Sequence, residues 1–188
     1  MIRIALVGEI ASGKTFISKC FRLPTFNADK EVKKIYKKNR SCFKKLKRKF
    51  PNCIKNYPIK KSEIKQILNK SNIKVLSKIV HPYVRFNLKK FEKKNFNKKF
   101  IVLDIPLLIE NKLYRKSDIL IGVKTSKKII INRLKKRSNY NKKIFDILRT
   151  QQINIKKKLK LCDFIIENNS GRNSIVIQIN KIKKKINV

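Results

Sequence analysis

Several residue types are scarce in this sequence, and each scarcity excludes a class of protein. The four cysteines stand far apart with no CxxC pair, and the single histidine, His81, cannot complete a usual zinc site. No apolar run reaches the ~18 residues of a membrane span. The first ten residues also lack the apolar core of a secretory signal. The composition therefore predicts a cytoplasmic protein with free thiols, outside membranes and without a zinc site.

Acidic residues are scarce as well. Eleven Asp and Glu stand against 51 Lys and Arg, which gives a net charge of +40. A field of this size attracts polyanions, so nucleic-acid binding is one interpretation. The basic residues are spread along the whole chain, however, and Ile and Asn, which AT-rich codons also specify, are abundant with Lys. We therefore favour compositional drift with a preference for small phosphate-bearing ligands, and expect no specific nucleic acid.

Glycine occurs only four times in 188 residues, and two of the four lie in the octet GEIASGKT. This octet fits the phosphate-loop pattern G-x-x-x-x-G-K-[ST] at every required position. Glycine lets the backbone approach phosphate oxygens, and successive N–H groups then surround the anion. Lys14 would reach the β- and γ-phosphates, and the Thr15 hydroxyl would ligate Mg²⁺. The predicted ATP-binding residues of this segment are Gly8, Glu9, Ile10, Ala11, Ser12, Gly13, Lys14, Thr15 and Phe16.

Apolar runs rich in Ile and Val alternate with helical patterns along the chain. Continuous runs of this kind are typical of strands buried on both faces of a parallel sheet. Alternation with helices favours an α/β fold of three layers around a parallel sheet. The strong runs are residues 2–8, 100–108, 118–125 and 163–169, with a weaker one near residue 25.

A long stretch without strong strands interrupts this alternation. From about residue 30 to residue 98 the apolar residues keep helical spacing, which predicts an inserted helical lobe. A second basic stretch, from Lys135 to Lys160, has few strand-forming residues and predicts a helical lid. We expect one kinase domain with a core (about 1–29, 99–134 and 151–188), a substrate-binding lobe (about 30–98) and a lid (about 135–150).

A phosphate loop alone leaves kinases, GTPases, helicases and transport ATPases open. A GTPase needs a base-specifying N-K-x-D segment, and the NKKI at Asn141 lacks its Asp. Helicases and transport motors usually need a longer chain. A small core with a helical insert and a basic lid favours a small-molecule kinase, because lobes that close over the phosphates exclude water.

Beyond the loop, several segments resemble the dephospho-CoA kinase family. The resemblance spans roughly residues 2–170, and its segments are GEIASGKT, NADKEVKKI (27–35), HPYVR (81–85), DIPLLIENKLYRKSD (104–118) and QQINIKKKLKLCDFIIENN (151–169). It implies a fold similar to nucleoside monophosphate kinases. It also implies transfer of the ATP γ-phosphoryl group to the 3′-hydroxyl of dephospho-CoA, with ATP and Mg²⁺, in a monomer or weak oligomer.

The resemblance also implies roles for individual residues. Asp29 matches the second acidic residue of a D-A-D motif and would accept the proton of the attacking hydroxyl, beside the catalytic Lys14. The first Asp of the motif is Asn27 here, which removes one carboxylate. Asp104, inside an apolar strand, would lie near Mg²⁺ or Lys14, or else make a buried capping contact.

Further residues are assigned by the same resemblance. His81, Arg85, Glu110 and Asn111 would contact the substrate, and His81-Pro82 would open a helix. Arg137 would be the catalytic lid arginine that closes on the ATP phosphates, with Arg133 as the alternative. Asn168 would contact the nucleotide near adenine, while Gln152 matches a family glutamine without an assigned role.

Two other functions stay open at this point. One is a different small phosphate-loop kinase, such as a nucleoside monophosphate kinase. The other is a basic nucleic-acid-binding ATPase, in which exposed aromatics between basic residues would stack on bases. Phe43 and Phe50 have helical spacing, which favours a place in the core instead.

Overall fold

The computed structural model describes residues 1–69, 71–136 and 140–188. These residues divide into two compact units. The first unit comprises Met1–Asn27 and Asn95–Val188, and the second comprises Ala28–Lys94.

A parallel sheet forms the centre of the first unit, as the apolar runs predict. Its strand order is β2-β3-β1-β4-β5, and every neighbouring pair is parallel. From Arg3 onward, β1 is buried along its whole length, because helices cover both faces of the sheet. The strands are β1 (Ile2–Gly8), β2 (Thr25–Asn27), β3 (Phe100–Asp104), β4 (Ile119–Lys124) and β5 (Phe164–Glu167).

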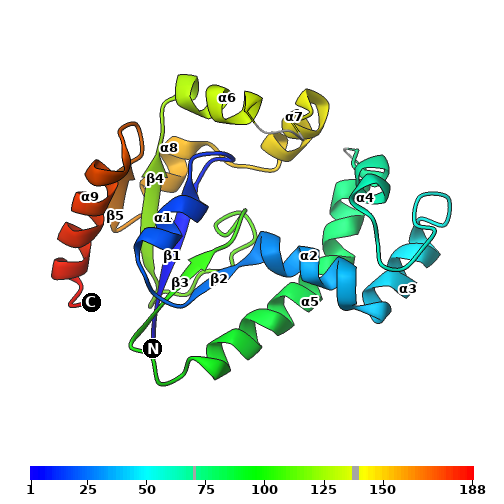
Figure 1. Cartoon of the computed structure of the whole chain (residues 1–188), viewed down its shortest axis with the longest axis horizontal. Coiled ribbons are helices and arrows are strands. Elements are labelled where there is room, and N and C mark those ends of the chain that lie inside the picture. The colour runs from blue at the N-terminus through cyan, green and yellow to red at the C-terminus, as the bar shows by residue number, and fades with distance from the viewer. Residues whose placement is uncertain (70, 137–139) are drawn as a thin grey trace. The chain divides into compact units, whose positions relative to one another are not determined.

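Helices cover the two faces of this sheet and complete three layers (Figure 1). On one face, Ile4 of β1 packs in a cluster with Ile17 of α1 and Ile179 of α9. On the other face, a Cβ on Gly122 would lie 2.5 Å from Leu159 of α8, so this helix packs directly on β4. The helices of the unit are α1 (Lys14–Cys20), α6 (Lys127–Lys135), α7 (Lys142–Thr150), α8 (Ile155–Leu159) and α9 (Arg172–Lys185).

The strand β3 is shorter than its apolar run predicts. It ends at Asp104, although the run continues to Leu108. Pro106 has no N–H to donate to a ladder, and Leu107 adopts a positive φ of 57° that turns the chain. Leu108 is nevertheless buried, because the turn folds back onto the unit. Apolar character here reflects burial in a turn and not a longer strand.

The second unit is helical, and its described residues contain no strand. Its core includes Ile35, Leu46, Ile64 and Val80. The expectation that Pro82 opens a helix is wrong, because Pro82 lies inside the longest helix. That helix continues through the proline because Ile73, Leu76 and Val80 hold its preceding turns in the core. The helices are α2 (Ala28–Lys38), α3 (Arg40–Lys49), α4 (Lys61–Ile67) and α5 (Asn72–Lys94). None of the helices in the described residues is long and apolar enough to cross a membrane.

Candidate active site

The octet Gly8–Thr15 connects β1 to α1 as a tight loop. A Cβ on Gly8 would lie 2.7 Å from Ser12 Oγ and 3.0 Å from the Val123 carbonyl oxygen. Gly13 has φ of +97°, and a Cβ there would lie 2.1 Å from Asn168 Nδ2. A Cβ at either position would force a neighbouring side chain to move, and at Gly13 the positive φ favours glycine independently. The loop therefore favours glycine at both positions, in a chain that uses very little of it.

The carbonyl oxygen of Ser12 is held by three donors from distant parts of the chain. Asn168 Nδ2 donates to it at 2.7 Å, Thr125 Oγ1 at 2.9 Å and an Arg133 guanidinium nitrogen at 3.1 Å. Arg133 also donates to the Asn168 side-chain oxygen at 3.1 Å. These three bonds fix the orientation of the Ser12 carbonyl, and therefore of the peptide group that leads into Gly13.

Asn168 was predicted to contact the nucleotide near adenine. The structure places its side chain in the interior, donating to the loop backbone and accepting from Arg133. Its observed contacts therefore shape the phosphate loop. The general loop pattern names only residues inside the octet, so it contains no signal for these outer supports.

Lys14 and Thr15 occupy the start of α1. The Lys14 ammonium donates to the carbonyl oxygens of Gly8 at 3.0 Å and Glu9 at 2.8 Å, across the opening of the loop. Thr15 Oγ1 donates to Asp104 Oδ2 at 2.6 Å. The hydroxyl and the carboxylate thus lie together at the end of β3, and oxygen donors of this kind suit Mg²⁺.

Asn27 completes this cluster at the end of β2. Its side-chain amide donates to the same Asp104 oxygen as Thr15, in a short hydrogen bond. Asp104 is only 3% exposed, so a buried carboxylate here receives two donors and is well satisfied. An aspartate at position 27 would set a second negative charge against Asp104. Asn27, which stands where the family motif has its first aspartate, thus stabilises the Asp104 carboxylate.

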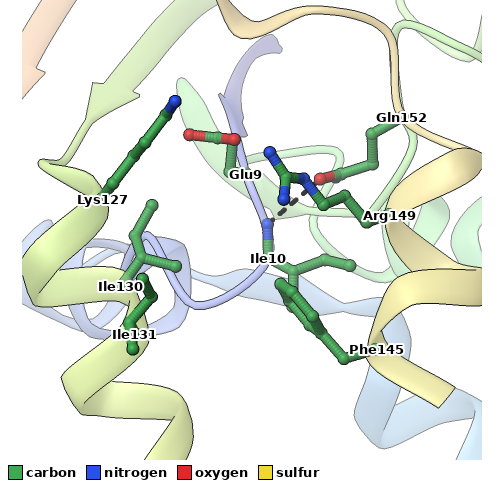
Figure 2. Close-up of a pocket in the computed structure, with 8 residues that line it drawn as sticks. All are labelled: Glu9, Ile10, Lys127, Ile130, Ile131, Phe145, Arg149 and Gln152. Carbon is green, nitrogen blue, oxygen red and sulfur yellow. Dashed lines mark hydrogen bonds between the residues drawn. The ribbon is translucent and has the colours of Figure 1, made fainter. Parts of the chain in front are cut away.

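A small pocket lies on the outer side of the loop, between α6 and the α7 segment (Figure 2). Gln152 Oε1 accepts a hydrogen bond from the Ile10 backbone N–H at 3.3 Å, which gives this glutamine an observed contact. Phe145 packs against the cluster of Ala11, Ile130 and Leu134. The α7 segment is thus attached to the phosphate loop at two points. The lining residues are Glu9, Ile10, Lys127, Ile130, Ile131, Phe145, Arg149 and Gln152.

Glu110, predicted to contact substrate, forms an ion pair with Lys158 of α8. Lys158 Nζ donates to Glu110 Oε1 at 2.8 Å, and Lys158 is only 1% exposed. The Ile153 backbone N–H donates to the same oxygen at 3.2 Å. Its neighbour Asn111 is exposed. Sequence reasoning missed Lys158, because one buried lysine in the run KKKLK cannot be told from its exposed neighbours.

Three of the predicted site residues belong to the second unit. Asp29 is exposed in the first turn of α2. His81 and Arg85 lie one turn apart in α5. Burial lowers the pKa of His81, and the positive charge of Arg85 lowers it further, so the imidazole is neutral at neutral pH. The predicted lid arginine, Arg137, lies outside the described residues.

Comparison with known proteins adds an independent observation. A family model described as dephospho-CoA kinase matches residues 2–174. The dephospho-CoA kinase of Bartonella henselae is 34% identical over 171 residues, covering 87% of each chain. That of Wolbachia pipientis wMel is 29% identical over 192 residues, covering 98% of each chain.

Solved structures show a similar fold. A crystal structure of TT1252 from Thermus thermophilus has a TM-score of 0.82 at 21% identity, covering 100% of this chain and 98% of that one. The dephospho-CoA kinase from Campylobacter jejuni has a TM-score of 0.63 at 23% identity, covering 98% and 96%. The predicted α/β fold is thereby confirmed.

Proposed function

The chain belongs to the dephospho-CoA kinase family, and we propose that it transfers the γ-phosphoryl group of ATP to the 3′-hydroxyl of dephospho-CoA. The observation that carries the proposal is the loop Gly8–Thr15, whose two glycines, lysine and threonine have the geometry that nucleotide phosphates need. Family membership selects the acceptor, which the loop alone leaves open.

The loop backbone and Lys14 would hold the phosphates of ATP. The N–H groups after Ser12 and the positive end of α1 favour an anion in the concavity. The Lys14 ammonium bonds the carbonyl oxygens of Gly8 and Glu9. When phosphates enter, this ammonium would exchange those neutral acceptors for charged oxygens, which bind it more strongly.

Mg²⁺ fits the cluster at the strand ends. Thr15 Oγ1 would be a direct ligand, and the Asp104 carboxylate, 2.6 Å from it, would orient the hydroxyl or a metal-bound water. A metal ion held by these residues would supply positive charge that offsets the charge of the ATP phosphates. Asn27 would hold the Asp104 carboxylate in place, because its amide donates to the same oxygen.

The acceptor end of the reaction would involve the second unit. Asp29 would take the proton of the 3′-hydroxyl as its oxygen bonds to the γ-phosphorus, while the bond to the β–γ bridging oxygen breaks and ADP leaves. His81, Arg85 and Asn111 would contact dephospho-CoA, and the lobe of residues 30–98 would supply most of that surface. These roles rest on the family resemblance of the corresponding segments.

The proposal is tested by turnover. Purified protein incubated with Mg-ATP and dephospho-CoA should release ADP and CoA. Lys14→Ala should lower kcat by at least ~100-fold, because the transferred phosphoryl loses its cation. Lys19→Ala removes an exposed lysine five residues later in α1 and should leave kcat unchanged.

Other results would separate the alternatives. Phosphorylation of another small acceptor, but not of dephospho-CoA, would favour a different small kinase. Absence of turnover combined with tight, salt-sensitive binding to nucleic acid would favour the basic ATPase. Full activity in Lys14→Ala would refute the assignment of the phosphate loop.

A further inference from the structure

One face of the α7 segment is directed at the phosphate loop. Phe145 and Gln152 contact the loop, and they are seven residues apart. Arg149 lies between them. It is one helical turn after Phe145 in α7, so these two side chains share a face. Gln152 follows the end of the helix, where its backbone N–H donates to the Arg149 carbonyl oxygen at 3.0 Å. Arg149 accordingly lines the same pocket as Glu9 and Ile10 of the loop (Figure 2). The contacts of Phe145 and Gln152 with the loop thus place Arg149 in the pocket beside Glu9.

Arg149 lies beside a loop residue that contacts Lys14. The lysine of a phosphate loop reaches the β- and γ-phosphates. Here the Lys14 ammonium is 2.8 Å from the Glu9 carbonyl oxygen and 3.0 Å from that of Gly8. Arg149 thus lines a pocket with a direct neighbour of the lysine that would reach the γ-phosphate.

Arg149 has no carboxylate partner to occupy it. Within the described part of the chain its side chain makes no ion pair or hydrogen bond, and it is exposed. Figure 2 shows the Glu9 carboxylate between the Lys127 ammonium and the Arg149 guanidinium. The negative charge of Glu9 attracts both cations toward this part of the loop without forming a close pair with either.

We propose that Arg149 is an arginine finger supplied in cis, which contacts the γ-phosphoryl group as it is transferred, and that the Glu9 carboxylate helps to position it. The inference rests on the proposed function. Arg149 forms no covalent bond; its planar guanidinium neutralises charge on the oxygens of the transferred group. This role is separate from the one predicted for Arg137, and it rests on contacts of Arg149 and its neighbours alone.

The test compares three variants of the full-length protein. Arg149→Ala and Arg149→Lys both remove the guanidinium, and Lys143→Ala removes an exposed charge from a different face of α7. Arginine fingers contribute ~10³–10⁵-fold to kcat, so we expect Arg149→Ala to lower kcat by at least ~100-fold with less than a ~3-fold change in KM for ATP. Arg149→Lys should recover only part of the rate, because an ammonium lacks the bidentate fork. Lys143→Ala should match the parent protein.

A binding measurement separates a finger from a structural support. ADP with aluminium fluoride mimics the phosphoryl group in transfer, whereas ADP alone lacks it. By calorimetry, Arg149→Ala should weaken binding of the ADP–aluminium fluoride complex by at least ~10-fold and leave ADP binding unchanged. Added guanidinium ion should restore part of the kcat that Arg149→Ala loses. It would not restore kcat if the substitution had only damaged the structure.

Two results would overturn the inference while leaving the proposed function intact. One is that the parent protein is active and the kcat of Arg149→Ala is within ~3-fold of the parent value. The other is equal loss of ADP and ADP–aluminium fluoride binding, which would make Arg149 a structural residue. Failure of the parent protein to phosphorylate dephospho-CoA would refute the proposed function instead, and the analogue-binding experiment would still decide the role of Arg149.

Discussion

At the scale of single residues, the phosphate loop depends on side chains that lie outside its motif. Asn168 and Arg133 bond each other and both donate to the Ser12 carbonyl. A Cβ on Gly13 would collide with Asn168, so the conformation of the glycine and the position of the asparagine specify each other. These contacts hold the loop in one conformation, which would reduce the entropy lost if a nucleotide binds there as proposed.

Loss of one of these supporting side chains should weaken the binding of nucleotide, measured as a higher Kd. In Arg133→Ala the Ser12 carbonyl and Asn168 both lose a donor. We expect a free-energy cost of about 1–3 kcal/mol, seen as a roughly 10-fold rise in the Kd for ADP by calorimetry. Arg133→Lys should recover part of it, since one donor can still reach Ser12. An unchanged Kd in Arg133→Ala would show that Thr125 and Asn168 suffice.

At the scale of elements, one carboxylate organises the turn that leads into α4. Glu63 is buried and accepts hydrogen bonds from the backbone N–H groups of Lys60 at 2.7 Å, Lys55 at 2.8 Å and Asn56 at 3.4 Å. Burial alone would raise its pKa, but these backbone donors outweigh burial and lower it. The segment from residue 55 to 60 has no regular structure of its own, so Glu63 substitutes for a backbone ladder.

Removing the charge of Glu63 should therefore destabilise the second unit in a pH-dependent way. We expect Glu63→Gln to lower the free energy of unfolding by about 1–3 kcal/mol at pH 7, because the new amide group opposes one of the N–H donors. The folded-state pKa is lowered, so this stability is complete above the ordinary carboxyl pKa of about 4.3 and is lost as the pH falls through the folded value.

Urea unfolding of the parent and Glu63→Gln between pH 7 and pH 3 measures this difference. The gap between the two proteins should close as the pH falls below about 4. A gap of constant size down to pH 3 would contradict the role given to the ionised carboxylate. Asp146→Asn, at an exposed position on α7, provides a control for general charge loss.

At the scale of the whole molecule, the few acidic residues are used in the interior. Glu63, Asp104 and Asp118 are buried, and Asp118 forms a two-bond ion pair with buried Arg3 of β1. The surface is left with a large excess of the 51 basic residues over the remaining acids. The positively charged side chains on such a surface repel one another. Salt screens this repulsion but leaves buried ion pairs almost unaffected.

Salt should therefore stabilise this protein. Raising NaCl from about 0.01 M to about 0.1 M shortens the Debye length from roughly 30 Å to roughly 10 Å, and we expect the urea midpoint of unfolding to rise over this range. Nonspecific binding to nucleic acid should fall over the same range. A midpoint that falls with salt would indicate that surface attractions outweigh repulsion despite the net charge of +40.

The parallel sheet, the run of helices between β2 and β3 and the tight loop of the octet could be predicted from the sequence alone, since each depends on residues close together along the chain. Lys14 and Thr15 follow from the octet, and the strands follow from continuous apolar runs. Only the tertiary structure decided which residues support the loop. Ser12 meets Arg133 across 121 residues and Asn168 across 156. It also singled out Lys158 and Arg149 among many similar cations, because burial and the face of a helix depend on packing that no local pattern records.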